Sequence, residues 1–207
     1  MRDVPHLSAL TRVLSEHEPE LAAAPARVFD LAAVAVVCAG PPEDLRVCFI
    51  RRAARVGDPW SGQMAFPGGR QDPSDATVQA VAEREAFEEV GLRLEQATLL
   101  GRLDDAAMRR KNGGVLASFV YDAGRAFPSL TPDPAEVAAT FWIPLAHLWD
   151  PANRTTVDWT HEGQAMQFPG IAHGDDVVWG LSLRVLGRLG ELLKMPLPDA
   201  LAPFRRR

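Results

Sequence analysis

Apolar runs separated by turn-forming residues mark the first half of the chain. The run LAAVAVVCAG at 31–40 is rich in β-branched residues and ends at GPPED, which predicts a buried strand followed by a turn. LRVCFIRRA at 45–53 predicts the partner of that strand in a hairpin. After a loop at 55–62, QMAFPGG at 63–69 predicts a short strand that runs into a glycine turn.

Apolar residues at helical spacing appear near both ends of the chain. A short helix is predicted within residues 1–28, ahead of a proline-containing linker. Its stripe is Leu7, Leu10 and Leu14. Residues 175–193 predict the best amphipathic helix of the sequence. Its stripe is Val185, Leu189, Leu192 and Leu193. A third helix is predicted at 76–90, where Asp75 is placed to cap the start and Gly91 suits a left-handed stop.

The remaining segments predict further strands. Two are expected at 97–105 and 113–123, joined by a loop, MRRKNGG. Residues 136–148 begin as a strand and turn helical after Pro144, and 155–172 contain two short strand candidates, TVDW and AMQF. The order β-β-β-α-β-β, followed by mixed elements, predicts an α/β (α+β) fold. We expect an α/β/α sandwich on a mixed β-sheet and not an alternating βαβ fold.

Length and composition are those of one globular unit. The chain has 207 residues, of which 47% are hydrophobic and 24% charged. We therefore expect a single domain at 29–207, including the C-terminal helix, with 1–28 as an N-terminal helix and linker. The formal net charge of −5 argues against electrostatic capture of nucleic acid. Oligomeric state stays open between monomer and homodimer.

Cysteine usage and the apolar runs bear on the compartment. Cys38 and Cys48 lie in strand-like runs without CxxC spacing, which favours buried free thiols over a zinc or redox site. The N-terminus lacks the apolar centre of a signal peptide. The longest apolar run, 31–40, is about half the length needed to span a bilayer. A cytoplasmic protein with no membrane partner is the expectation.

Three carboxylates gather on the predicted helix at 76–90. At about 100° per residue its stripe is apolar for two turns and then acidic. The stripe consists of Val78, Val81, Ala82, Glu85, Glu88 and Glu89. Three adjacent anions, if partly buried, must take up protons or bind a cation, and Mg²⁺ or Mn²⁺ suits carboxylate oxygens. The alternative is a solvated acidic face.

Two neighbouring features favour the metal. Arg84 is able to pair with an acid one turn on, or to reach back to the preceding loop, and so orient the carboxylates. Upstream, the turn in FPGG allows the backbone to approach a ligand closely, so that a carbonyl of this turn becomes a candidate metal ligand.

FPGGRQDPSD followed by REAFEEVGL resembles the Nudix box, G-x5-E-x7-R-E-U-x-E-E-x-G-U, where U is a bulky apolar residue. Gly69 opens the box, and the other positions that match in place are Arg84, Glu85, Glu88, Glu89, Gly91 and Leu92. There are three departures: Asp75 replaces the first glutamate, the next spacer is eight residues long, and Ala86 is small. The longer spacer is similar to the coenzyme A pyrophosphatase branch of the family.

The resemblance implies a metal-dependent hydrolase of a nucleoside diphosphate linked to another group. By the same resemblance, Glu85, Glu88 and Glu89 bind the metal. The Gly69 carbonyl is an additional ligand and Arg84 orients a glutamate. Asp75 is expected to support the loop and helix without touching metal.

The general base stays open at this point. In the family it is a box glutamate or an acid on a distant loop. Glu136 is one candidate, because its segment resembles the EV…W-x-P-L strand found late in Nudix chains, and Asp104 and Asp105 are others. For each of them the alternative is an ordinary surface acid.

Upstream residues bear on the substrate. The segment 51–69 resembles a motif of coenzyme A pyrophosphatases, to which it matches at Gly62, Gln63, Phe66, Pro67, Gly68 and Gly69, with Arg52 and Ala53 similar to its start. The middle departs, with one extra residue around Asp58, Pro59 and Trp60. Late in the chain VVWGLSLRVL resembles a W-G-x-T segment, with Ser182 in place of threonine.

Several residues of this region are candidates for substrate binding. Three arginines could bind phosphates, including a 3′-phosphate, or be merely solvated. They are Arg51, Arg52 and Arg55. Gly68 and Gly69 are expected to bring backbone close to the substrate. Trp60 either stacks on a base or packs on the core, and we favour core packing.

Three functions compete. The first is a coenzyme A pyrophosphatase that yields 3′,5′-ADP and 4′-phosphopantetheine. The second is a Nudix enzyme for another small nucleotide, such as a nucleoside triphosphate, a nucleotide sugar or a dinucleoside polyphosphate. The third is a non-catalytic binding module, which the intact REAFEEVG disfavours because binding alone does not require three clustered acids.

Overall fold

The computed structural model describes residues 4–23, 30–58, 60–108, 114–161 and 164–197, without the side chains of 160–165. Its main sheet has the order β3-β2-β1-β7-β5, with β4 on β1, β6 on β7 and β8 on β2. These strands are β1 (Leu31–Ala39), β2 (Arg46–Arg52), β3 (Met64–Ala65), β4 (Gly68–Arg70), β5 (Thr98–Arg102), β6 (Ala106–Ala107), β7 (Val115–Asp122) and β8 (Val137–Pro144).

The pairing of the central strands makes this sheet mixed. β1 and β7 run parallel along their whole length, from Leu31 opposite Val115 to Cys38 opposite Asp122. β1 and β2 are antiparallel, as expected for the predicted hairpin. β4 extends the same edge of β1. The expected mixed sheet is therefore confirmed. Most of the loop MRRKNGG lies outside the described residues.

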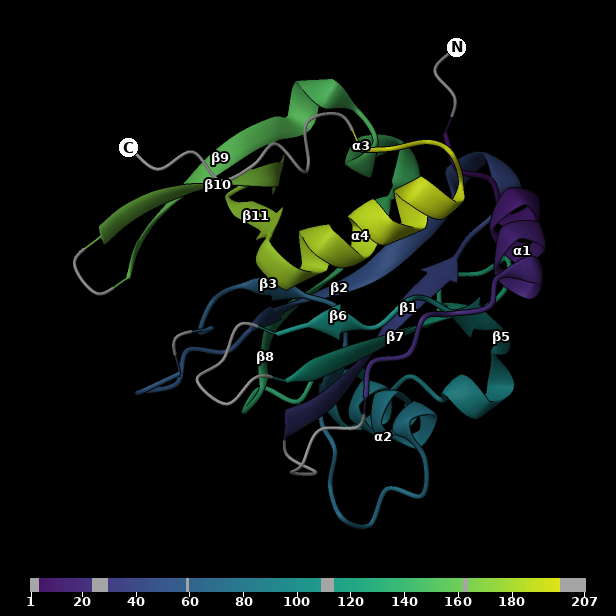
Figure 1. The fold of residues 1–207 in the computed structure, drawn as a ribbon, viewed down its shortest axis with the longest axis horizontal. Coiled ribbons are helices and arrows are strands. Elements are labelled where there is room, and N and C mark those ends of the chain that lie inside the picture. Colours follow the sequence, from purple (N-terminus) through teal and green to yellow (C-terminus); the bar gives the residue numbers. More distant parts are fainter. Residues whose placement is uncertain (1–3, 24–29, 59, 109–113, 162–163, 198–207) are drawn as a thin grey trace.

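Helices cover both faces of the sheet (Figure 1), with α2 (Val78–Val90) below it and α4 (Gly180–Leu192) above it. The alternation of side chains along β1 explains the two layers. Ala33, Ala35 and Val37 pack with α2. Val36 and Cys38 belong to the opposite core. α1 (Leu7–Glu16) and α4 also contribute to this core, so the α/β/α sandwich is confirmed.

The last third of the chain forms a second, three-stranded sheet. Its strands are β9 (Arg154–His161), β10 (Gln164–His173) and β11 (Asp176–Trp179), in the order β11-β10-β9. The two short strands expected at 155–172 are thus longer and form one hairpin. The prediction of a helix from 175 was wrong at its start, because the helix begins at Gly180. Gly174 has φ +60°, which suits the tight turn of a second hairpin, and this turn makes the following residues a strand.

Short helical segments connect these elements. α3 (Leu145–Leu148) directly follows Pro144, as predicted. Single-turn 3₁₀ segments lie at η2 (Pro42–Asp44), η3 (Leu94–Gln96) and η4 (Pro151–Asn153). In the described part of the chain, no helix has the length and apolar character needed to cross a membrane.

The ends of α2 follow local capping chemistry. The predicted cap at Asp75 is wrong: Thr77 is the N-cap, and its hydroxyl accepts from the Ala80 N–H at 3.1 Å. The Asp75 carboxylate is already engaged by Arg84 and by the Asp72 N–H. Gly91 ends the helix at φ +73°, as expected.

Both cysteines are fully buried free thiols, as predicted. Burial, with a smaller contribution from Asp122, raises the pKa of Cys38 on β1 to about 12. Burial also raises the pKa of Cys48 on β2, and the nearby charge of Glu89 adds to this. Cys48 therefore lies in the electrostatic range of the acidic helix face.

Candidate active site

The acidic stripe of α2 begins where its apolar stripe ends. Val81, Ala82, Ala86 and Val90 are buried against the sheet. Glu89 follows the same face and is only 1% exposed. Glu85, one turn earlier, is mostly buried as well. The fold thus places two carboxylates at the boundary between α2 and the sheet.

The glycine turn lies directly against these two acids. The Gly68 N–H donates to Glu89 Oε2 at 2.9 Å. Gly68 has φ +155°, and a Cβ there would overlap the Ala33 carbonyl. A Cβ on Gly69 would overlap the Glu85 carboxyl. Gly68 therefore lets the turn lie close to β1, and Gly69 lets the backbone approach the Glu85 carboxyl of α2.

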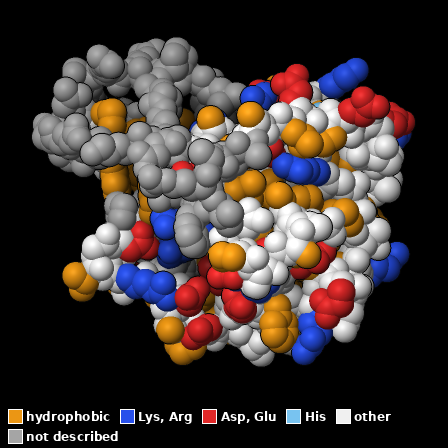
Figure 2. Space-filling view, turned by 60° about the horizontal axis from the view of Figure 1, so that its bottom comes forward, with side chains coloured by type: hydrophobic (Ala, Val, Ile, Leu, Met, Phe, Trp, Pro, Cys, Tyr) orange, Lys and Arg blue, Asp and Glu red, His pale blue; other side chains and the backbone are white. Residues whose placement is uncertain are grey.

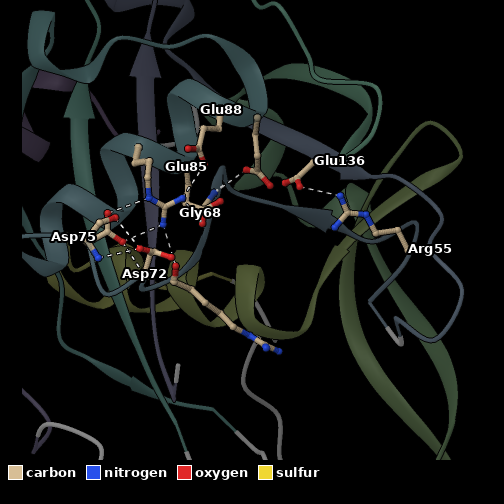
Figure 3. A network of polar contacts seen from close by, with 11 residues as sticks. Arg55, Gly68, Asp72, Asp75, Glu85, Glu88 and Glu136 are labelled. Atoms are coloured by element: carbon tan, nitrogen blue, oxygen red, sulfur yellow. Dashed lines mark hydrogen bonds and ion pairs between the residues drawn. The ribbon is translucent and has the colours of Figure 1, made fainter. Parts of the chain in front are cut away.

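A third acid joins from a distant part of the sequence. Glu136 lies in the turn that precedes β8, and its carboxylate, with those of Glu85 and Glu89, forms a group (Figure 3). One oxygen from each lies within 4.8 Å of the others. Among the general-base candidates, Glu136 is the one brought to this group of three carboxylates, which we call the acidic group.

The other two candidates for the base are engaged elsewhere. Asp104 bonds to His17 and to the Glu20 N–H. Asp105 pairs with Arg102 at 2.6 Å and accepts from the Ala22 N–H at 3.0 Å. Both aspartates hold the N-terminal segment against the main sheet, which gives them a structural role.

Arg84 connects the box to its loop. Its guanidinium pairs with Asp75 through two bonds of 3.0 Å and donates to the Arg70 carbonyl at 3.0 Å. It also pairs with Glu85 at 3.0 Å and with Glu88 at 2.7 Å. Arg84 thus makes both contacts that the sequence offered, with an acid one turn on and with the preceding loop. The pKa of Asp75 is lowered, chiefly by its bond to Arg84.

Glu88 lies outside the acidic group. Its side chain is 54% exposed and turns to Arg84. A role for Glu88 and for the Gly69 carbonyl in metal binding stays a prediction.

The protein groups around the acidic group do not fully compensate its negative charge. Burial raises the pKa of Glu89 to about 8, against the lowering effect of the Gly68 N–H, and the neighbouring Glu85 adds to the rise. Burial also raises the pKa of Glu85, partly offset by Arg84. Two desolvated carboxylates side by side need a proton or a cation. The donor set is made of carboxylate oxygens, so these residues fit Mg²⁺ or Mn²⁺.

The three predicted phosphate-binding arginines all pair with acids. Arg51 pairs with Asp176 of β11 at 3.2 Å. Arg52 pairs with Asp58 at 3.1 Å. Arg55 pairs with Glu136 at 2.8 Å, a contact that sequence spacing gave no means to find, because the two residues are 81 positions apart.

The position of Trp60 corrects a further expectation. Its side chain is 48% exposed, so the preferred prediction of core packing is wrong. The Trp60 N–H donates to Asp58 Oδ1 at 3.0 Å, and this turn within the loop carries the indole on the surface. A tryptophan at this position is accessible to a ligand.

Comparison with known proteins agrees with this geometry. The NUDIX domain matches residues 29–161, which is more than half of the chain. The uncharacterized Nudix hydrolase NudL of Photorhabdus laumondii is 30% identical over 77% of this chain and 82% of that protein. Human mitochondrial coenzyme A diphosphatase NUDT8 is 32% identical over 63% of this chain, and the match spans 56% of that protein.

The fold has a solved counterpart as well. A MutT/nudix family protein from Enterococcus faecalis superposes with a TM-score of 0.52 over 95% of this chain and 74% of that one, at 18% identity. With the domain match, the box on α2 and this fold together, the chain belongs to the NUDIX domain family and is a Nudix pyrophosphohydrolase.

Proposed function

We propose that the protein hydrolyses the pyrophosphate linkage of coenzyme A or its derivatives, giving 3′,5′-ADP and 4′-phosphopantetheine. One observation carries this proposal. The segment 51–69, which resembles the motif of coenzyme A pyrophosphatases, is joined to the acidic group at two points: Gly68 bonds Glu89, and Arg55 bonds Glu136. The similarity to a protein named coenzyme A diphosphatase supports the same substrate.

The residues that would hold the metal are Glu85 and Glu89, with Glu88 and the Gly69 carbonyl added by the family resemblance, and Glu136 lies beside them. A bound Mg²⁺ or Mn²⁺ would neutralise charge on the phosphate oxygens and lower the pKa of a coordinated water. Arg84 keeps Glu85 and Glu88 in fixed orientations through its ion pairs. This arrangement limits reorganisation of the acids during the reaction.

Glu136 is the proposed general base. The Glu136 side chain is 40% exposed, whereas Glu89 is almost fully buried, so a water molecule can reach Glu136. It would accept a proton from the water as the water oxygen attacks one phosphorus. The bond from that phosphorus to the bridging oxygen then breaks, and the bridging oxygen leaves with the other phosphate.

Substrate contacts would come from the end of β2 and from the loop and glycine turn that follow it. Arg51 and Arg52 are proposed to exchange their present carboxylate partners for phosphates of the ligand, since a guanidinium binds either group in a fork. The exposed Trp60 would stack on the adenine base. Gly68 and Gly69 would border the phosphates through their backbone.

A panel of substrates with Mg²⁺ and with Mn²⁺ tests the proposal. It contains coenzyme A, acyl-coenzyme A, ADP-ribose, NADH, diadenosine polyphosphates and nucleoside triphosphates, with products identified by mass. We expect 4′-phosphopantetheine from coenzyme A, and loss of nearly all turnover in Glu89→Gln. Turnover only of members other than coenzyme A and acyl-coenzyme A would reject the proposed substrate, and no turnover of any member would favour a binding module.

A different small nucleotide is the second candidate, and one contact favours it. Asp58 belongs to the stretch where the loop departs from the coenzyme A motif, and it pairs with Arg52. An anion beside this arginine weakens its attraction for an additional phosphate. If the substrate lacks a 3′-phosphate, Asp58→Asn should leave the KM of the true substrate within about twofold of wild type.

A further inference from the structure

Arg55 and Glu136 join two loops that border the acidic group. Arg55 Nη2 donates to Glu136 Oε1 at 2.8 Å. Arg55 Nε and Nη2 also donate to the Ala135 carbonyl, at 3.2 and 3.0 Å. Figure 3 shows Arg55 reaching Glu136 from the side away from Glu85. The planar guanidinium thus holds both the backbone and the carboxylate of this turn.

The backbone of Arg55 is fixed in turn by its own loop. The Arg55 N–H donates to Ser61 Oγ at 2.9 Å, and this hydroxyl donates back to the Arg55 carbonyl at 3.0 Å. At the base of the loop the Ala53 N–H donates to the Glu136 carbonyl at 2.8 Å. The two bonds with Ser61 fix Arg55 within its own loop, and the bond from Ala53 joins that loop to the backbone of Glu136.

The turn that carries Glu136 is also attached to α2. The Asp133 N–H donates to the Glu89 carbonyl at 3.0 Å, and the Thr131 N–H donates to the Val90 carbonyl at 2.9 Å. These bonds fix the backbone of the turn but leave the Glu136 side chain half-exposed beside two other carboxylates. Like charges repel, and a solvated conformation away from the group is open to it. Arg55 is the cation on its outer side.

We propose that Arg55 is a positioning residue, which keeps the Glu136 carboxylate directed at Glu85 and Glu89 and does not bind substrate phosphate. The inference rests on the proposed function, because Glu136 belongs to the reacting site. It replaces the sequence-based assignment of Arg55 to phosphates. Both partners are about half-exposed, so the pair adds little to stability and acts through geometry.

Kinetics of Arg55→Ala and Arg55→Lys test the proposal on coenzyme A, or on the substrate that the panel identifies. We expect Arg55→Ala to lower kcat about 10- to 100-fold with KM within about twofold, because a displaced base slows the chemical step alone. Lysine keeps the charge but not the fork, so kcat should recover in part. The control is Arg188→Ala, which removes an exposed arginine paired with Glu191 on α4 and should match wild type.

Mn²⁺ binding gives a readout that needs no substrate. Titration followed by electron paramagnetic resonance should show the Kd for Mn²⁺ raised at least about threefold in Arg55→Ala. In a Glu136→Gln background the same change should have no further effect, since the coupled partner is already altered. Additive effects in this cycle would overturn the proposal. A raised KM with unchanged kcat would also overturn it and restore the phosphate-binding role. If wild type does not hydrolyse coenzyme A but hydrolyses another member of the panel, only the proposed substrate is rejected, and the role of Arg55 is tested on that member.

Discussion

Glu89 combines two properties that conflict in the absence of a cation. It is almost fully buried, and it lies within reach of Glu85 and Glu136. The single N–H donated by Gly68 offsets only part of the desolvation of its charge. The folded protein therefore keeps a proton on this residue to a higher pH than the unfolded chain does.

The free energy of unfolding of the metal-free protein should therefore depend on pH. The pKa of Glu89 is raised from 4.5 to about 8 on folding, so the folded state is penalised progressively as pH rises through that window. Glu89→Gln, which cannot ionise, should match wild type below about pH 4.5 and exceed its Tm by at least about 5 °C above pH 8. Thermal unfolding in a chelator, over a pH series, measures this.

Addition of Mn²⁺ should reverse the order of the two Tm values at high pH, because only wild type keeps the full acidic group. Glu95→Gln removes an exposed carboxylate and serves as the control. Parallel curves for wild type and Glu89→Gln across the pH range would show that burial of Glu89 is not the source of the effect.

At the scale of elements, the end of α2 is coupled to the turn that supplies Glu136. Gly91 ends the helix with φ +73°, and a Cβ there would overlap the Thr131 hydroxyl. Thr131 in turn bonds to the last helical residue, Val90. The glycine that ends the helix therefore has a second effect, since it leaves space for the turn 131–136.

Gly91→Ala should consequently lose both stability and activity. Left-handed backbone costs alanine about 1 kcal/mol, and displacement of Thr131 adds to this, for a total of about 2–3 kcal/mol. Gly174→Ala is the matched control, because Gly174 also has positive φ but faces open space. Chemical denaturation gives the two free energies. Equal losses, with kcat unchanged in Gly91→Ala, would disprove the coupling.

How far the sequence predicts these elements depends on whether the deciding contact is local. The helix predicted at 76–90 is present as Val78–Val90 and ends at the predicted glycine. Of its three acids, Glu85 and Glu89 lie together, and Glu88 turns to Arg84. The N-cap was misplaced because Asp75 and Thr77 are both good caps, and only the distant Arg84 decides between them. The start of the last helix was misplaced because the turn at Gly174 makes a strand of residues compatible with either state. The ion pair of Arg55 with Glu136 joins loops with no shared periodicity.

Across the whole molecule, both ends of the chain complete one core. Leu10 and Leu14 of α1 lie in the same cluster as Leu186 and Leu189 of α4. The indole of Trp149 donates to the Met195 carbonyl at 2.7 Å, and the Ser182 hydroxyl donates to the Met64 carbonyl at 3.1 Å. Residues 164–197, which follow the end of the NUDIX match at 161, thus contribute to this core.

A cavity left in the core by truncation of an α4 side chain should therefore destabilise the entire protein. Leu186 has no exposed surface, and Leu186→Ala should cost about 2–5 kcal/mol. Circular dichroism and tryptophan fluorescence should still report a single transition at the lower Tm. Leu99→Ala, at an exposed position of β5, should change stability by less than about 1 kcal/mol. Two separate transitions in Leu186→Ala would show that the C-terminal segment unfolds independently.

The rate at which the two buried cysteines are alkylated reports how often the centre of the sheet opens. Alkylating reagents react with thiolates, and neither Cys38 nor Cys48 is exposed or easily ionised in the folded sheet. Alkylation of either thiol requires β1 and β2 to separate. The alkylation rate therefore depends on how often the centre of the sheet opens. Cys48 of β2 lies close enough to Glu89 for the charge of Glu89 to affect its pKa. Its alkylation rate therefore reports the opening of the strand beside the acidic group. A cation bound between those carboxylates would stabilise the closed sheet and so lower the alkylation rate, although it contacts neither sulfur.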